Sequence, residues 1–132
     1  MPKKKPLDDE ELHMIIGVVK ESFPGERRVA LIPAVVPNLT KAGLEVLVEN
    51  GAGQEAGYPD AAYQEKGARI AKDRGEVLGS ADVLVQVRGF GANPEAGKAD
   101  LAKQKKDQVV IGFLEPLSAP DSAKELAQKG VA

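Results

Sequence analysis

The sequence has no cysteine, one histidine and few aromatic residues, and each shortage excludes a class of function. Without cysteine the chain has neither disulfides nor thiolate chemistry. A single histidine rules out a histidine-rich metal site, and an aromatic content of 4% gives little surface for stacking single-stranded nucleic acid. No apolar run approaches the ~20 residues that a membrane-spanning helix needs. The composition therefore favours none of these specialised classes.

The charge is nearly balanced, with a formal net charge of −2 over 132 residues. This balance gives no electrostatic basis for binding nucleic acid. Residues 3–5 are lysines, but residues 8–11 are acidic where a secretory signal would be apolar. We expect residues 1–12 to be a disordered, solvated arm and residues 13–132 to fold as one domain.

Apolar runs alternate with helix-like segments every 20–25 residues, which is typical of a parallel sheet. Gly43, Gly67 and Gly130 mark helix ends, and Asp60 is placed to cap a helix. Pro37 indicates either a helix start or a bend. We predict strands over 13–19, 44–49, 68–71, 81–87 and 108–114, helices over 33–42, 61–66, 73–78, 94–104 and 118–129, and the start of another strand at 131–132. The fold class is α/β, a Rossmann-like (flavodoxin-like) parallel sheet with helices on both faces.

The segment 51–56 fits the dinucleotide pattern G-x-G-x-x-G/A and follows a predicted strand. A pyrophosphate site needs a helix that begins inside the pattern, so that its amides face the phosphates. Gly57 and Pro59 interrupt any such helix, and Glu49 places a negative charge just before it. We therefore interpret the segment as a turn whose glycines adopt positive φ.

Charged residues follow three of the predicted strands, where ligands bind in open α/β sheets. Glu26, Arg27 and Arg28 form a cluster that is either a structural pair or an arginine aimed at an anion. Arg88 ends the fourth strand, and Glu115 follows the fifth. Each is either a solvated strand end or part of a site, with Glu115 as a possible acid/base group. His13, before the first strand, is interpreted as a surface residue.

Four segments occur in a distinctive order and spacing: Ile16-Gly17-Val18-Val19-Lys20-Glu21, Arg28-Val29-Ala30-Leu31-Ile32-Pro33, Gly43-Leu44-Glu45-Val46-Leu47-Val48-Glu49-Asn50-Gly51-Ala52-Gly53 and Ala81-Asp82-Val83-Leu84-Val85-Gln86-Val87. Together they resemble one family, the N-terminal domain shared by alanine dehydrogenase and the alpha subunit of proton-translocating NAD(P) transhydrogenase. The resemblance covers residues 14–132, and a more distant saccharopine dehydrogenase group shares a Glu-Arg-Arg-like block.

The resemblance implies roles for three residues that line a cleft. In alanine dehydrogenases the arginine matching Arg28 holds the pyruvate carboxylate, and a lysine and a histidine stand at the positions of Arg88 and Glu115. Arginine cannot readily give up a proton. Glutamate is negative or neutral where histidine is neutral or positive, so it does not replace histidine as the same acid/base group. The segment 112–117 is similar to the transhydrogenase pattern. The resemblance thus favours the transhydrogenase alpha subunit, with Arg28 facing the cleft, Arg27 and Glu26 structural, and no catalytic residue assigned.

The resemblance also implies cofactors and partners. NAD(H) would be bound mainly by a domain with no counterpart before Ala132, so we expect the chain to be an inactive fragment with an exposed apolar face. NADP(H) would lie on a partner subunit. The implied partners are that domain, the membrane and NADP-binding subunits and a second copy, on the cytoplasmic side of a membrane. The alternatives are an amino-acid dehydrogenase of the alanine or saccharopine type and a non-catalytic α/β module.

Overall fold

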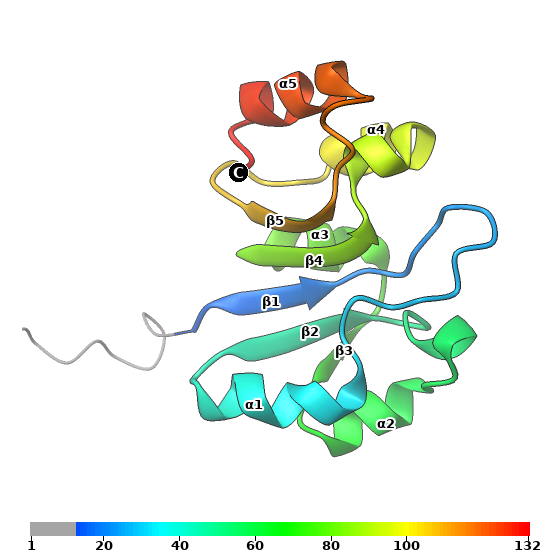
Figure 1. The fold of residues 1–132 in the computed structure, drawn as a ribbon. Helices are drawn as coiled ribbons and strands as arrows, with labels where there is room; N and C mark the ends of the chain where they lie inside the picture. Colours follow the sequence, from blue (N-terminus) through cyan, green and yellow to red (C-terminus); the bar gives the residue numbers. More distant parts are fainter. Residues whose placement is uncertain (1–12) are drawn as a thin grey trace, which may run out of the picture.

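A five-stranded parallel sheet forms the centre of the molecule, as the sequence predicts (Figure 1). The computed structural model describes residues 13–132, so the arm predicted over 1–12 lies outside the described residues. Each strand lies within two residues of its predicted bounds, because buried parallel strands are nearly continuous apolar runs. The strands are β1 (Ile15–Val18), β2 (Glu45–Glu49), β3 (Arg69–Ala71), β4 (Val83–Arg88) and β5 (Val109–Phe113).

The strand order is β3-β2-β1-β4-β5, and every pairing is parallel. This is the Rossmann order of the doubly wound folds, with β1 in the middle and the chain turning back between β1 and β4. Gly17 on β1 pairs with Leu47 on one side and Leu84 on the other. All five carboxyl ends therefore meet at one edge, where such sheets bind ligands.

Helices cover both faces of the sheet but not all of one of them. On one face α1 (Val36–Lys41) and α2 (Asp60–Glu65) pack on β1, β2 and β3 around buried Val36 and Tyr63. On the other face α3 (Arg74–Ser80) buries Val77 and Leu78 against the same strands and β4. The C-terminal elements α4 (Pro94–Leu101) and α5 (Pro120–Lys129) pack on that second face beyond β4.

The first face is bare over β4 and β5. Ile111 and Phe113 point away from the core there and are 59% and 64% exposed. Val110, between them in sequence, packs inward on the opposite face. Within residues 13–132 no helix is long and apolar enough to cross a membrane.

Two predicted helix starts differ in detail from the structure. A 3-10 turn, η1 (Pro33–Val35), precedes α1, so Pro37 lies in the first turn of the α-helix, where its missing N–H costs nothing. The prediction that Asp60 caps a helix is wrong: Pro59 is the capping residue, and Asp60 accepts a hydrogen bond from the Gly51 amide instead. A carboxylate that stabilises the preceding loop is not available to its own helix.

The prediction of a further strand at the C-terminus agrees with the pairing of Ala132. Its N–H donates to the carbonyl of Gln108, and its carbonyl accepts from the amide of Val110, at 2.9 and 2.6 Å. This is the alternating pattern of a parallel ladder. The outer edge of β5 is thereby paired as far as Val110.

Candidate functional site

The loops that follow β1, β4 and β5 bring the three predicted site residues to one hollow at the carboxyl edge of the sheet. Arg28 comes from the loop after β1, Arg88 ends β4, and Glu115 follows β5. The hollow has a volume of about 240 Å³. We call it the charged hollow; it is lined by Arg28, Arg88, Ala92, Phe113 and Glu115. Arg28 and Arg88 thus lie on the same side of the fold.

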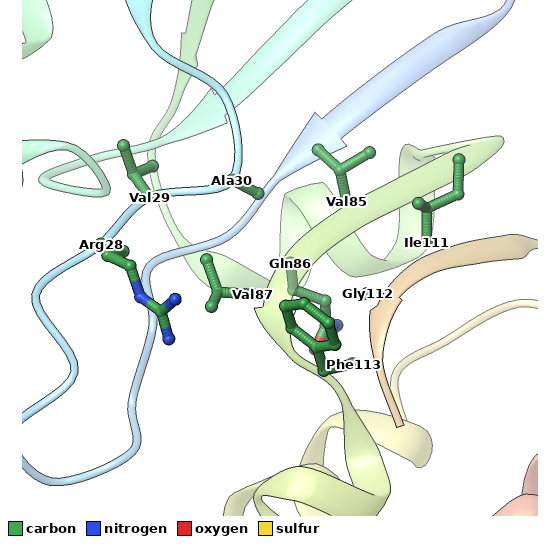
Figure 2. Close-up of a pocket in the computed structure, with 9 residues that line it drawn as sticks. All are labelled: Arg28, Val29, Ala30, Val85, Gln86, Val87, Ile111, Gly112 and Phe113. Carbon is green, nitrogen blue, oxygen red and sulfur yellow. The ribbon is translucent and has the colours of Figure 1, made fainter. Parts of the chain in front are cut away.

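A second hollow of about 540 Å³ adjoins the first and shares Arg28 and Phe113 with it. In Figure 2 the Arg28 side chain reaches toward the ends of β4 and β5, whose apolar side chains form the floor. This apolar hollow is the bare face of the sheet, lined by Arg28, Val29, Ala30, Val85, Gln86, Val87, Ile111, Gly112 and Phe113. Two cations therefore stand at the border of an uncovered apolar surface.

Glu26 joins the two arginines. Its Oε1 accepts from Arg28 Nη2 at 2.7 Å and from Arg88 Nε at 3.0 Å, and its Oε2 accepts from Arg28 Nε at 3.0 Å. The Glu26 side chain is only 5% exposed. The hydrogen bonds from Arg28, joined by the one from Arg88, lower the pKa of Glu26 from 4.5 to about 2. The carboxylate is therefore ionised at neutral pH and compensates part of the arginine charge.

The prediction that Arg27 and Glu26 are both structural is wrong for Arg27, whereas Glu26 does hold the two arginines. Arg27 is 75% exposed, and its nearest carboxylate is Glu55, at 3.9 Å. Residues 26 to 29 form no helix or strand, and the side chains of residues 26 and 28 lie on one side of this segment while residue 27 lies on the other. The sequence offered a structural ion pair or an anion-binding arginine as alternatives. In the structure Arg28 is both, because it pairs with Glu26 and also lines the charged hollow.

Glu21 fixes the end of β4 from the loop after β1. Its two carboxylate oxygens accept the backbone N–H groups of Val87 and Arg88, at 3.0 and 2.7 Å. Burial raises the pKa of Glu21 above its usual 4.5, against the two backbone hydrogen bonds, which lower it. Sequence reasoning did not single out Glu21, because its partners are 66 and 67 residues away.

Glu115 stands on strained backbone. It is one of two non-glycine residues with positive φ in the described part of the chain, at +48°. Its carbonyl accepts the amides of Ser118 and Ala119, which turns the chain into α5. Its carboxylate has no hydrogen-bond partner among residues 13–132 and is free to face the charged hollow.

We expect Glu26 to make stability depend on pH in acid. Because its folded pKa lies below its unfolded value, the unfolded chain binds more protons between pH 4.5 and about 2. The contribution is complete above pH 4.5 and is lost as the pH falls toward 2. Urea unfolding of the native chain and of Glu26→Gln should therefore give a stability difference that shrinks across this window. Glu21, whose pKa is raised, acts above pH 4.5 with the opposite sign, and a difference unchanged down to pH 2 would contradict the prediction.

The segment 51–56 is a turn and does not fit a dinucleotide. Gly51 has φ +80°, as a turn requires, and only a three-residue 3-10 turn, η2 (Gln54–Ala56), follows it. A Cβ on Gly53 would lie 2.6 to 2.8 Å from the Tyr63 ring and the Tyr58 carbonyl. Glu49 is held by Arg74 at 3.0 Å and accepts the Lys20 amide. This chain supplies no helix N-terminus for a pyrophosphate there.

Metal binding has no support in the described part of the chain: residues 13–132 contain no group of three histidine or acidic residues placed to hold an ion. His13 is exposed, as predicted, and lies beside Asp82 and Asp107 at the amino ends of the strands. It is thus at the opposite edge of the sheet from Arg28 and Arg88.

Comparison with known proteins gives one family and two kinds of relative. Residues 17–132 match the family described as alanine dehydrogenase/PNT, N-terminal domain. The NAD(P) transhydrogenase subunit alpha of Cereibacter sphaeroides is 33% identical over 117 residues, 89% of this chain and 21% of that protein. Alanine dehydrogenase 1 of Staphylococcus aureus is 34% identical over 118 residues, 89% of this chain and 30% of that protein.

The structural comparison agrees. The crystal structure of transhydrogenase from Sinorhizobium meliloti superposes with a TM-score of 0.78 at 32% identity, over 89% of this chain and 33% of that one. The chain thus spans between a fifth and a third of the length of these relatives.

Proposed function

The chain belongs to the family of the alanine dehydrogenase/PNT N-terminal domain, and on that premise we propose that it forms one wall of the catalytic cleft of an NAD(P) transhydrogenase alpha subunit. The complete enzyme would move hydride from NADH to NADP⁺, coupled to proton translocation. Its relatives are oxidoreductases of both the transhydrogenase and the alanine dehydrogenase kind at nearly equal identity. The choice between them rests on the chemistry of the charged hollow.

One observation carries the choice: the charged hollow holds two arginines and no lysine or histidine. Forming an amino acid from a keto acid requires protons to be given and taken at nitrogen and oxygen, so its site needs an acid/base group. Arginine keeps its proton, and Glu26 is bonded to both guanidiniums. Hydride transfer between two nicotinamides protonates no substrate atom, so that step needs no acid/base group at this site. The two arginines of the charged hollow therefore suit transhydrogenation better than amino-acid dehydrogenation.

The bare apolar face supports the proposal that this chain packs against further polypeptide. Exposed apolar surface of this kind marks an interface. It adjoins the two arginines, so whatever covers it also closes the charged hollow. We assign NAD(H) binding mainly to parts of the enzyme beyond this chain, since segment 51–56 does not fit a dinucleotide. We propose further that NADP(H) lies on a partner subunit. The proposed partners are membrane and NADP-binding subunits and a second copy of the chain, at the cytoplasmic side of a membrane.

Amino-acid dehydrogenation stays the second candidate, favoured by the free carboxylate of Glu115 at the charged hollow. Glu115 is the one acidic group there that no arginine engages among the described residues. If it gives and takes protons, Arg28 and Arg88 would hold a keto acid carboxylate beside it.

Membranes that contain the complete protein separate the candidates. We expect NADPH to form from NADP⁺ and NADH, and no oxidation of NADH by pyruvate and ammonium. Replacement of Glu115 by glutamine should leave the transhydrogenase rate within about twofold, since no proton passes through it, and Arg27→Gln serves as the surface control. Oxidation of NADH that requires pyruvate and ammonium, abolished by Glu115→Gln, would establish the dehydrogenase instead. The absence of both activities would favour a non-catalytic module.

A further inference from the structure

A tight turn after β1 carries two side chains to the end of β4. The amide of Glu26 donates to the carbonyl of Phe23 at 3.0 Å, Pro24 takes the second position, and Gly25 has φ +84°. These are the features of a type II turn, which needs glycine at its third position. The first and fourth residues of such a turn lie close together. Here they are an aromatic ring and a carboxylate.

Both groups contact the same arginine. The guanidinium carbon of Arg88 lies 4.2 Å from the centroid of the Phe23 ring, within the range of a cation–π contact. Arg88 Nε donates to Glu26 Oε1 at 3.0 Å. The ring takes one face of the guanidinium and the carboxylate takes one edge. Its two terminal nitrogens have no partner among residues 13–132 and are left for the charged hollow.

Arg28 is held by the same carboxylate through a second edge. Its Nε and Nη2 donate to the two oxygens of Glu26, and its Nη1 has no partner among the described residues. The two guanidiniums share the oxygen Oε1. A flexible, half-exposed arginine would otherwise lose rotamer freedom on meeting a ligand.

We infer that Phe23 and Glu26 are positioning residues that hold Arg28 and Arg88 in place for an anionic group entering the charged hollow. The clamp selects arginine at position 88, because an ammonium cannot both stack on the ring and donate from a planar edge. The inference rests on the proposed function only for the identity of the anion, a carboxylate or a phosphate. The clamp itself stands on contacts within this chain.

The side-chain Nε–H signals of Arg28 and Arg88 in ¹⁵N NMR spectra of the chain test the clamp. We expect both to be resolved and slow to exchange in the native protein, and both to be lost in Glu26→Gln. Phe23→Leu should remove the ring-current shift of Arg88 and leave Arg28 unchanged. Arg27→Gln is the matched control and should change neither signal. Signals that survive Glu26→Gln in a folded chain, or native signals that are already averaged, would overturn the inference.

Whether Glu26→Gln weakens or tightens anion binding shows whether Glu26 positions the two arginines or only neutralises their charge. Glu26→Gln makes the hollow more positive, so a carboxylate that only neutralised charge would, once removed, leave tighter binding. Ordering one long side chain costs roughly 2- to 12-fold in affinity, so with two arginines freed we expect binding to weaken by roughly 4- to 140-fold. Pyruvate and inorganic pyrophosphate are the probes, and the one that shifts the two arginine signals of the native chain identifies the class of anion. The affinities of the native chain and of Glu26→Gln are compared through the backbone amide signals of residues 113–115, which border the hollow. Tighter binding to Glu26→Gln, or no shift of either signal in the native chain by either probe, would overturn the inference.

The two proposals can fail separately. Complete enzyme that oxidises NADH with pyruvate and ammonium would overturn transhydrogenation and leave the clamp intact. Averaged arginine signals in an enzyme that forms NADPH would overturn the clamp and leave the function.

Discussion

Replacing Arg74 by methionine is expected to lower the free energy of unfolding by about 2 kcal/mol, between the values for exposed and fully buried pairs, because removing one partner of a half-buried ion pair leaves the opposite charges uncompensated. Arg74 begins α3 and is 22% exposed. Its Nε and Nη2 donate to the two oxygens of Asp100 at 2.7 and 2.6 Å. Its Nη1 donates to the Lys20 carbonyl at 2.6 Å and to Glu49 at 3.0 Å. Urea unfolding followed by circular dichroism measures the loss.

Arg69→Met is the matched control for this prediction. Arg69 also pairs with two carboxylates, Glu45 and Glu76, at 2.9 and 3.0 Å. Its side chain is half-exposed, and exposed pairs contribute roughly 0–1 kcal/mol. We expect less than about 1 kcal/mol there. Equal losses in the two variants would show that burial does not set the strength of the Arg74 cluster.

The Arg74 cluster matters because it anchors the base of the loop that carries the site. Lys20 follows β1, Glu49 ends β2, and Asp100 lies on α4, so one guanidinium joins three elements at the carboxyl edge. The loop from residue 19 to residue 32 begins at this anchor and reaches Glu26 and Arg28. Loosening Arg74 should therefore also disturb the clamp.

The elements of the fold could be predicted because their signals are local. β2 and β4 are apolar runs bounded by turn residues, and Gly43 and Gly130 end helices with positive φ. Asp73, which accepts the Glu76 amide, caps α3 at the first residue of the predicted segment. Asp60 misled because a carboxylate next to a helix start can serve either the helix or a neighbouring loop.

The site could be predicted only in part, because its contacts join distant residues. Resemblance brought Arg28, Arg88 and Glu115 together, and the structure places them around one hollow. It did not reveal that Glu26 lies between the arginines, since Glu26 and Arg88 are 62 residues apart. The Pro24-Gly25 turn was the available signal, because such a turn brings its first and fourth residues together.

The bare face over β4 and β5 shows a further limit of local patterns. Alternate residues of β5 face the two sides of the sheet, yet both sides are apolar, as in a strand covered on both faces. The sequence therefore reads as a buried strand, although in the described chain one side is exposed. Apolar residues on both sides of β5 suit a strand that is covered on both sides, which is consistent with a partner that covers the bare face.

Replacing Gly91 by alanine is expected to destabilise the protein by about 2–3 kcal/mol, the upper part of the range for overpacking. A Cβ at Gly91 would overlap the backbone carbonyl of Leu114 and approach its carbon to 2.9 Å. Backbone cannot swing aside as a long side chain can. The turn after β4 and the segment after β5 would have to separate, which displaces Glu115 from Arg88 across the charged hollow.

Gly79→Ala in α3 is the control, since nothing lies within 4 Å of the added Cβ. It should be neutral or stabilising by up to about 1 kcal/mol. Urea unfolding measures both changes, and backbone amide shifts of residues 113–115 report the displacement. A Gly91→Ala protein as stable as Gly79→Ala would mean that the two strand ends are not held in contact, and the charged hollow would then be set by whatever covers it.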